Sequence, residues 1–370
     1  MRIAHVVGTR TAANIRDTER HVVYLAEAQR ECGLDATVLT GRRGLFFNWC
    51  TGDGIPTFVV ADLQPGAFAR GIAARLEDLS PEIIHCHDLS VTRTVVEAAG
   101  MLEVPCVVTL HEGAAGRIIP EIIAARRAGR TFTVITAARS EAEFLNVNGL
   151  AGAGAHYVPY GTRTRHVAQQ QELGPACRPN LMTASSLEFA KGIDLAILAM
   201  VELRRRRGSE CPVLNIYGAG DSGENQLEKV FGDVSEYLTD MTTVLRLNDV
   251  VRFHETQADV LNRCASDLLI VPSRFETGPL IVLEAMSRGM PVVACDVGRV
   301  AEMLPDRRYG RVVPTNSITA LADAIDSMLT DLASGQFDPD LLIRRHQSHY
   351  SAEEMADRIA TVYQSAMLAG

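Results

Sequence analysis

Short apolar runs alternate with longer segments of helical periodicity along almost the whole chain. Most runs are nearly continuous rather than alternating, which is typical of parallel strands covered on both faces. Between them, residues 18–32 repeat apolar side chains at helical spacing, and Gly33 suits the position just after a helix end. The strands expected in the first half are 2–8, 35–40, 56–61, 82–87, 105–111, 131–137 and 155–159.

The alternation stops over residues 161–180, which are polar and lack a hydrophobic period, so we interpret them as a linker. Repeated strand–helix units on either side predict an α/β protein with two doubly wound Rossmann-like domains facing across a cleft. We expect a domain at 1–165 and another at 166–349, with a final helix at about 350–370 packing back on the first. The strands expected in the second domain are 181–185, 213–217, 250–254, 267–271, 291–295 and 311–313.

Composition narrows the class of protein. With 47% hydrophobic and 22% charged residues, the chain of 370 residues is neither collagen-like nor disordered. No apolar run approaches the length of a membrane-spanning helix, and the opening MRIAHVVG indicates a strand rather than a signal peptide. A net charge of −9 argues against nucleic acid as a partner. We therefore expect a cytoplasmic enzyme or binding protein, with a homodimer left open.

Neither the cysteines nor the histidines form a recognisable metal motif. The eight cysteines include no C-x-x-C pair, and several lie in apolar strands, so free thiols are expected. His85 and His87 share one face of an expected strand, but the residues around them supply no further ligands. Core and cleft-lining roles are favoured for both histidines, and we expect no metal or other cofactor.

Residues 267–298 are the most informative stretch. An apolar strand leads into a loop with Glu276, and Thr277-Gly278-Pro279 opens a helix that contains Glu284. Proline suits the first helical turn, and a glycine lets backbone amides approach a ligand closely. The start of a helix attracts an anion such as a diphosphate, and a carboxylate further along accepts from both hydroxyls of a ribose. Solvated surface positions are the alternative, but the apolar neighbours of Glu284 weaken it.

Glu276 and Glu284 form an E-x7-E pair inside PSRFETGPLIVLEAMSRGMPVVA. This stretch resembles the nucleotide-sugar signature of the family-4 retaining glycosyltransferases of the GT-B fold. Shorter segments extend the resemblance over most of the chain. They are IIHCHD (83–88), VVTLHE (107–112), VPYGT (158–162), TASSLEFAKG (183–192), NIYGAG (215–220) and VVRFHE (250–255).

The resemblance implies roles for particular residues. Glu276 would contact hydroxyls of the donor sugar, and Lys191 would place a cation on the diphosphate; the alternative for Lys191 is a solvated helix-start charge. His111 would approach the donor sugar and the reacting centre, or would simply pack at a strand end. The remaining residues implied in donor binding are Ser186, Gly218, Phe253, His254, Gly278, Pro279, Leu280 and Glu284, with Glu284 on the ribose.

The chain departs from the family pattern at two phosphate contacts. Ser186 stands where the family has an arginine, and Arg16 and Asp17 stand where it has two glycines. Because the diphosphate needs cations, we expect Arg16 to replace the missing arginine. A solvated charge in a polar loop is an equally good interpretation of Arg16.

The resemblance implies a transferase that moves a hexosyl group from a nucleoside diphosphate sugar to a hydroxyl group, with retention and without a metal. The acceptor would bind the first domain and the donor the second. Uridine as the base, and a small-molecule, glycan or lipid acceptor, are family expectations that the sequence does not resolve. Two alternatives remain: a nucleotide-sugar 2-epimerase and a non-catalytic sugar-nucleotide-binding relative.

Overall fold

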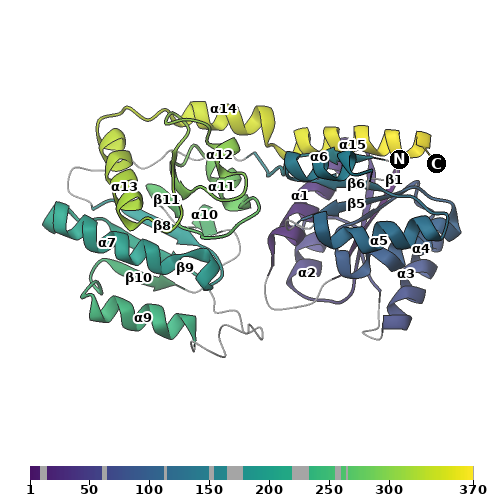
Figure 1. The fold of residues 1–370 in the computed structure, drawn as a ribbon, viewed down its shortest axis with the longest axis horizontal. Helices are drawn as coiled ribbons and strands as arrows, with labels where there is room; N and C mark the ends of the chain where they lie inside the picture. Colours follow the sequence, from purple (N-terminus) through teal and green to yellow (C-terminus); the bar gives the residue numbers. More distant parts are fainter. Residues whose placement is uncertain are drawn as a thin grey trace. The chain divides into compact units, whose positions relative to one another are not determined.

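The computed structural model describes residues 1–8, 15–60, 65–111, 115–149, 154–164, 178–218, 233–254, 260–263 and 266–369. Two compact units make up the chain (Figure 1). The first contains Met1–Arg163 together with Ser348–Gly370, and the second contains Thr164–Gln347. Residues 165–177 of the expected linker, with Cys177 and Cys264, lie outside the described part of the chain.

The first unit is built on a parallel sheet in the order β3-β2-β1-β4-β5-β6-β7. The order reverses between β1 and β4, which are neighbours in the sheet although they are far apart in the chain. Its strands are β1 (Arg2–Val7), β2 (Asp35–Thr40), β3 (Thr57–Val59), β4 (Ile83–Cys86), β5 (Cys106–Leu110), β6 (Thr133–Thr136) and β7 (Ala155–Tyr157). Its helices are α1 (Asp17–Glu31), α2 (Leu45–Gly52), α3 (Pro65–Leu79), α4 (Thr92–Leu102), α5 (Ala115–Arg127), α6 (Arg139–Val147) and α15 (Ala352–Ala369).

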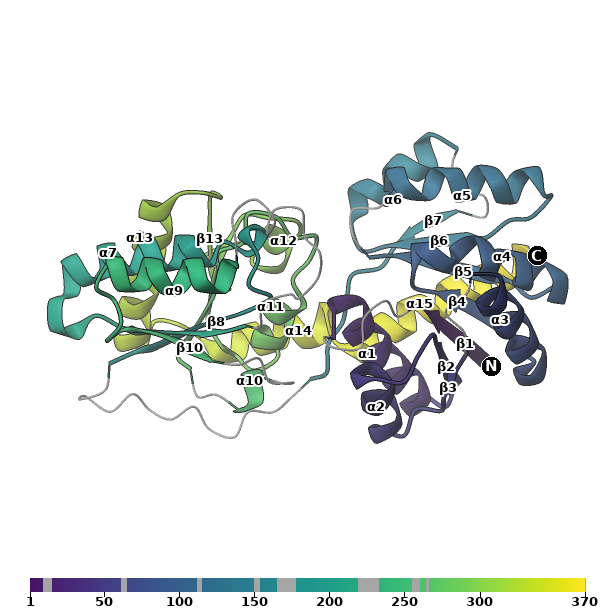
Figure 2. The ribbon, with the colours of Figure 1, turned by 90° about the horizontal axis from the view of Figure 1, so that it is seen from below.

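Helices cover both faces of this sheet, which explains why its strands are apolar throughout. On one face, α1 and the C-terminal helix α15 pack side by side over Ile3, Ile83 and Val107 (Figure 2). On the other face, side chains of α3, α4, α5 and α6 enclose a second core around Ile84 and Val108. The last helix of the chain therefore belongs to the first unit.

The second unit repeats the architecture with a parallel sheet in the order β10-β9-β8-β11-β12-β13, which reverses between β8 and β11. Its strands are β8 (Asn180–Ala184), β9 (Val213–Tyr217), β10 (Val251–His254), β11 (Leu268–Val271), β12 (Val292–Cys295) and β13 (Arg311–Val313). Its helices are α7 (Ile193–Arg207), α9 (Val234–Val244), α10 (Val260–Arg263), α11 (Leu280–Met286), α12 (Val300–Met303), α13 (Ile318–Ala333) and most of α14 (Pro339–His349).

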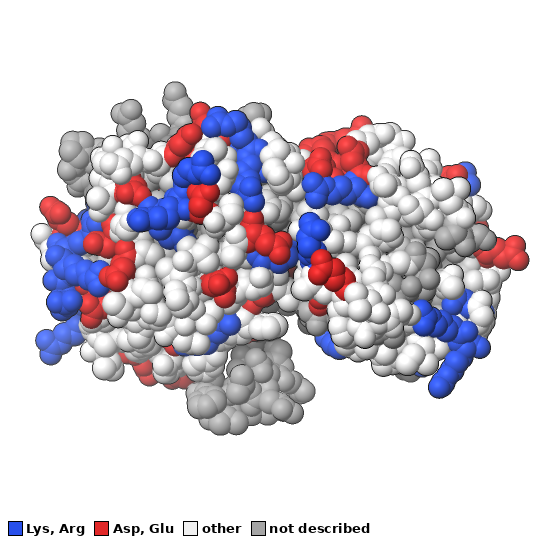
Figure 3. Space-filling view, turned by 45° about the horizontal axis from the view of Figure 1, so that its top comes forward, with Lys and Arg blue, Asp and Glu red and all other residues white. Residues whose placement is uncertain are grey.

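Many surface arginines of the second unit pair with carboxylates. At the end of α7, Arg206 Nη1 lies 2.6 Å from Asp323 of α13, and Arg207 Nε lies 2.5 Å from Asp326 of the same helix. On the face drawn in Figure 3, basic and acidic side chains lie beside each other rather than in one extended basic area. None of the described helices combines the length and the apolar composition needed to cross a membrane.

Candidate active site

In the second unit, two predicted catalytic residues meet where the strand order reverses. Lys191 ends a short 3-10 helix, Phe189–Lys191, that follows β8, and Glu276 lies in the loop after β11. The Lys191 ammonium donates to Glu276 Oε1 at 2.6 Å, and Ser273 Oγ lies 3.4 Å from the same oxygen. Both side chains remain partly exposed, at 23% and 14%. The carboxyl edge of a parallel sheet at such a reversal is the usual ligand site of doubly wound folds.

The two loops that carry this pair are held against each other. Gly192 has φ +65°, and a Cβ there would lie 2.1 Å from the carbonyl oxygen of Pro272. Arg274 donates to both carboxylate oxygens of Asp194, at 2.7 and 2.6 Å, and its backbone N–H bonds to Ala190. A bidentate arginine–carboxylate pair fixes direction as well as distance. Arg274 and Asp194 were not singled out from the sequence, since each reads there as an ordinary surface charge.

Glycines bring backbone close to backbone along the same edge. Gly218 follows β9, and a Cβ on it would lie 2.7 Å from the carbonyl oxygen of Ser185. Ser186 is the next residue and is partly exposed. Gly278 follows β11, and a Cβ there would come within 3.1 Å of the guanidinium of Arg299, which is buried. Side chains at 218 and 278 would therefore displace their neighbours, which agrees with the glycines in the sequence.

Helix α11 begins at Leu280, with Pro279 as its N-cap, so the helix predicted after Thr277-Gly278-Pro279 is confirmed. The proline stands one position before the first helical turn rather than within it. Glu284 is 5% exposed, so it is not a solvated surface charge. A buried carboxylate in a short helix at this edge is a strong candidate for recognising a polar ligand.

At the end of β10, the side chain of His254 contacts other residues of the second unit. Its ring stacks on Tyr217 with the centroids 4.6 Å apart, and its Nε2 lies 2.9 Å from Asn215 Oδ1. Phe253 is half-buried beside it. The backbone carbonyl of His254 also has a partner in the unit, since it accepts from the N–H of Gly218 at 3.2 Å.

In the first unit, His111 follows β5 and is half-buried at the carboxyl edge of the sheet. Its Nδ1 lies 3.0 Å from the hydroxyl of Tyr160, and its Nε2 lies 3.3 Å from Nδ1 of His87. Burial, with a smaller contribution from the charge of Arg16, lowers the pKa of His111 to about 3. The imidazole is therefore neutral at pH 7, and both ring nitrogens have neighbours within the unit.

His111 belongs to a cluster of five histidines, and the expectation that His85 and His87 lack partner residues is wrong. His5, paired in register with His85, contributes from β1, and His21 contributes from α1. His85 is bonded to Tyr363 and Thr109, at 2.6 and 2.7 Å. Burial is the main cause that lowers the pKa values of His5, His85 and His87. Ring nitrogens of His5, His85 and His87, and of His21, His87 and His111, come close enough to hold a metal ion.

Arg16 occupies the N-cap of α1 in the first unit. Its backbone N–H donates to Glu19 Oε2 at 2.8 Å, and its guanidinium lies 3.6 Å from Glu19 Oε1. Glu19 is 1% exposed, and burial raises its pKa. The Arg16 side chain is 42% exposed, so it combines a local ion pair with access to solvent. Its predicted role toward the diphosphate stays a prediction.

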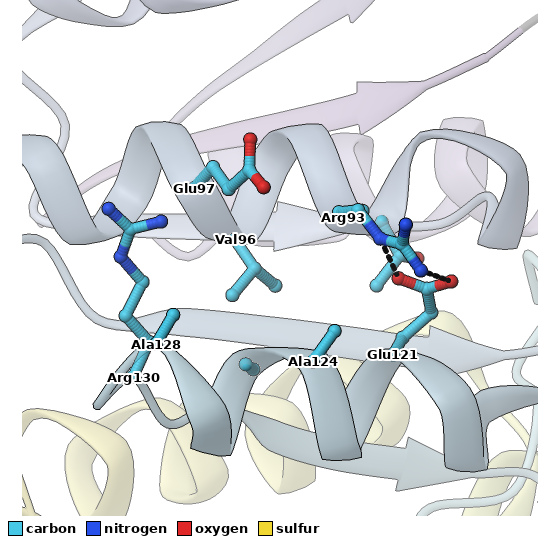
Figure 4. Close-up of a pocket in the computed structure, with 9 residues that line it drawn as sticks. Arg93, Val96, Glu97, Glu121, Ala124, Ala128 and Arg130 are labelled. Atoms are coloured by element: carbon cyan, nitrogen blue, oxygen red, sulfur yellow. Dashed lines mark hydrogen bonds and ion pairs between the residues drawn. The ribbon is translucent and has the colours of Figure 1, made fainter.

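A shallow groove between α4 and α5 lies apart from these residues (Figure 4). Alanines line its floor, the ion pair of Arg93 and Glu121 closes one end, and Arg130 lies at the other. It contains none of the residues predicted from the sequence.

Comparisons with known proteins agree with the resemblance. The family described as "Glycosyl transferases group 1" matches residues 168–336, and "Glycosyl transferase 4-like domain" matches residues 18–161. A glycogen synthase of Mycobacterium tuberculosis is 26% identical over 311 residues, which cover 77% of this chain and 69% of the relative. An alpha-D-kanosaminyltransferase of Streptomyces kanamyceticus is 28% identical over 209 residues, covering 53% and 50%.

Solved structures share the fold over the full length. Anabaena HepE in complex with UDP-glucose has a TM-score of 0.80 at 18% identity, covering 99% of this chain and 100% of that one. Sucrose-phosphate synthase from Thermosynechococcus elongatus has a TM-score of 0.76 at 19% identity, covering 100% and 99%.

Proposed function

Because the chain belongs to the GT-B glycosyltransferases of the GT4 type, we propose that it transfers a hexosyl group from a UDP-sugar to a hydroxyl group, with retention at the anomeric carbon. The donor binds the second unit and the acceptor, a small molecule, glycan or lipid, binds the first. The single observation that carries the proposal is the contact of Lys191 with Glu276, where the sheet order of the second unit reverses.

In the proposed reaction, the bond from the anomeric carbon to the diphosphate oxygen breaks, and a bond to the acceptor oxygen forms on the same face. The departing phosphate takes the acceptor's proton, so neither a protein nucleophile nor a metal is needed. Charge grows on the diphosphate as it departs, and a preorganised cation stabilises that charge more than it stabilises the bound donor.

Lys191 and Glu276 bind different parts of the donor, the phosphate and the sugar. The Lys191 side chain is 23% exposed, so its ammonium exchanges the Glu276 oxygen for a phosphate oxygen at little cost. Glu276, released from the lysine, accepts from sugar hydroxyls. Backbone groups at Gly278 and Leu280 face the phosphates, Glu284 takes the ribose, and Arg16 adds a second cation.

The proposal is tested first by binding. Uridine diphosphate and UDP-glucose should raise the melting temperature of the wild-type protein, and the Lys191→Ala variant should lose part of that rise. Arg205→Ala is the matched control, because Arg205 is an exposed cation on α7 paired with Glu202. No stabilisation by any nucleoside diphosphate sugar would contradict the proposal.

A second measurement separates the reaction classes. Slow hydrolysis of the donor without acceptor, in the presence of a chelator, with release of the α-anomer from an α-linked donor, supports a retaining and metal-independent transferase. Conversion of the donor to an epimeric nucleotide sugar would identify a 2-epimerase instead. Binding without any turnover, also with candidate hydroxyl acceptors, would identify a non-catalytic relative.

A further inference from the structure

Five of the chain's ten histidines gather at one end of the first unit's sheet. We propose that three of them, His21, His87 and His111, form a binding site for one transition-metal ion of the zinc class. The site goes beyond the proposed sugar transfer, which uses no metal, and its test does not depend on that activity. It rests on how hydrogen bonds at two ends of the cluster orient the imidazoles between them.

The first anchor is the side-chain carbonyl of Gln29, whose Oε1 lies 2.8 Å from His5 Nε2. A carbonyl oxygen only accepts, so Nε2 of His5 carries the proton and Nδ1 of this neutral ring is an acceptor. His5 Nδ1 lies 2.9 Å from His87 Nε2, which must therefore be the donor. This leaves the lone pair of His87 on Nδ1, the nitrogen that points toward His111.

The second anchor is Tyr160. Its hydroxyl donates its one proton to the backbone carbonyl oxygen of His111 at 3.0 Å, so toward the ring it acts as an acceptor. His111 Nδ1, at 3.0 Å from the same hydroxyl, is then the protonated nitrogen. The lone pair of His111 is left on Nε2, which faces His87.

The two anchors together make two lone pairs face each other. His87 Nδ1 and His111 Nε2 are 3.3 Å apart, farther than the other ring contacts of the cluster at 2.6–3.0 Å. Tetrahedral zinc with bonds of about 2.0–2.1 Å holds neighbouring ligand nitrogens about 3.3–3.4 Å apart. A metal ion bound to both nitrogens would remove the repulsion between the lone pairs at the spacing that the nitrogens already have.

His21 supplies the third ligand. Its ring lies 4.8 Å from that of His111 between centroids, and the three ligand nitrogens lie within 4.8 Å of one another. Closing the widest possible gap to about 3.3 Å requires a shift of about 1.5 Å, within reach of a side-chain rotation. Three histidines with one further position left for water or an anion are a recurrent zinc geometry.

The surroundings also suit a metal better here than at the neighbouring triplet. The outer N–H groups of His87 and His111 already have acceptors in His5 and Tyr160, as the ligands of metal sites usually do. The triplet of His5, His85 and His87 would instead sacrifice the short bonds of His85 to Tyr363 and Thr109. A metal at the proposed site occupies Nε2 of His111 and should therefore inhibit any reaction that uses that nitrogen.

Metal titration of the untagged, chelator-treated full chain tests the site. We expect one Co²⁺ per chain, with the visible absorption bands of tetrahedral cobalt, displaced by Zn²⁺. His21→Ala and His111→Ala should each weaken binding at least tenfold, whereas His349→Ala, an exposed histidine, should not. Gln29→Leu, which removes the first anchor without touching a ligand, should weaken binding by about 10- to 100-fold.

Three results would overturn the proposal. One is the absence of stoichiometric binding, another is unchanged affinity in both His21→Ala and His111→Ala, and the third is a thiolate charge-transfer band that places cobalt on cysteines. If the alanine variants do not fold, the wild-type protein still decides the question. Bound Co²⁺ should shift the proton resonances of three imidazoles, and fewer than three shifted rings would exclude the site.

Discussion

The two units share one topology but differ in the chemistry of the edge where each strand order reverses. Between β1 and β4 the first unit places buried, neutral imidazoles whose nitrogens are engaged with one another and with Gln29, Tyr160 and Tyr363. Between β8 and β11 the second unit places a partly exposed ammonium–carboxylate pair among glycines. The topology decides where a ligand binds, and the side chains decide which ligand that is.

The two edges also differ in the free-energy cost of rearranging their side chains. The Lys191–Glu276 pair is partly open to solvent, so a charged ligand replaces one partner without leaving a buried charge behind. Rearranging the histidine cluster instead breaks buried hydrogen bonds, each of which is costly to leave unmade. We therefore expect the second unit to respond mainly to charge changes and the first to respond mainly to pH and to lost hydrogen bonds.

The largest expected effect tests the charged edge. Lys191→Ala should lower kcat by roughly 100- to 1,000-fold, with a smaller loss of donor affinity, because the negative charge on the departing diphosphate grows in the transition state. Lys191→Arg should restore part of kcat, since a planar guanidinium does not reproduce a compact ammonium. Steady-state kinetics beside Arg205→Ala measures this, and wild-type kcat in Lys191→Ala would remove the lysine from the mechanism.

The second-largest expected effect is a difference between the two units in their stability in acid. The pKa of His5 is about 4 in the folded chain against 6.5 ordinarily, because burial disfavours its charged form. Its stabilising contribution is therefore complete above about pH 6.5 and is lost as the pH falls to 4, a loss of about 3 kcal/mol. His85, His87 and His111 shift in the same direction in the same unit. Among the described histidines with a lowered pKa, only His346 belongs to the second unit, so fewer such groups oppose its folding in acid.

We therefore expect the metal-free first unit to unfold at a higher pH than the second. The single tryptophan of the chain, Trp49, lies in the first unit and reports its unfolding by fluorescence. Hydrogen exchange of β8 to β13, read by mass spectrometry, reports the second unit. Acid unfolding of the second unit before the Trp49 transition would show that the histidine cluster does not govern acid stability.

A smaller effect on binding is expected at Glu284, the residue proposed to contact the ribose. Glu284→Gln keeps the shape of the side chain but removes its charge, so uridine diphosphate should bind more weakly by roughly 1.5–3 kcal/mol. Calorimetry measures the change, with Glu302→Gln, an exposed glutamate on α12, as the control. Equal affinities for wild type and Glu284→Gln would mean that Glu284 is buried for packing rather than for binding.

The smallest effect concerns the C-terminal helix. The hydroxyl of Tyr363 lies 2.6 Å from His85 Nδ1 and 3.3 Å from Gln29 Nε2. Tyr363→Phe leaves these buried groups without that partner and should lower the free energy of unfolding by about 1–3 kcal/mol. Urea unfolding beside Tyr237→Phe, an exposed tyrosine of the second unit, measures it. An unchanged stability would show that the hydroxyl contributes nothing to the cluster.

Periodicity was enough to find the elements because it is a property of neighbouring residues. The strand predicted at 105–111 is β5 (Cys106–Leu110), and the helix predicted at 18–32 is α1 (Asp17–Glu31). The final helix predicted at about 350–370 is α15 (Ala352–Ala369). Boundaries differ by a residue or two where the apolar pattern continues past the last ladder hydrogen bond.

The candidate site was less evenly predictable. Glu276 and Lys191 were singled out one by one, each from its own motif, and the structure then placed them in contact across 85 positions of sequence. Arg274 and Asp194, which hold the same loops together, carry no local signal because an ion pair shows in a sequence only when its partners are a few residues apart. His5 was hidden in an apolar strand, where a histidine resembles any other core residue.

The sequence by itself therefore determined which segments become strands, helices and glycine-lined turns, because side-chain spacing and turn chemistry act over a few residues. Only the tertiary structure decided which segments became neighbours. The register of β1 against β4 brought His5 beside His85, and the packing of α1 and α15 on that face added Gln29 and Tyr363. Strand order and register depend on contacts between distant parts of the chain, and these determine whether a histidine is a solitary base or part of a cluster.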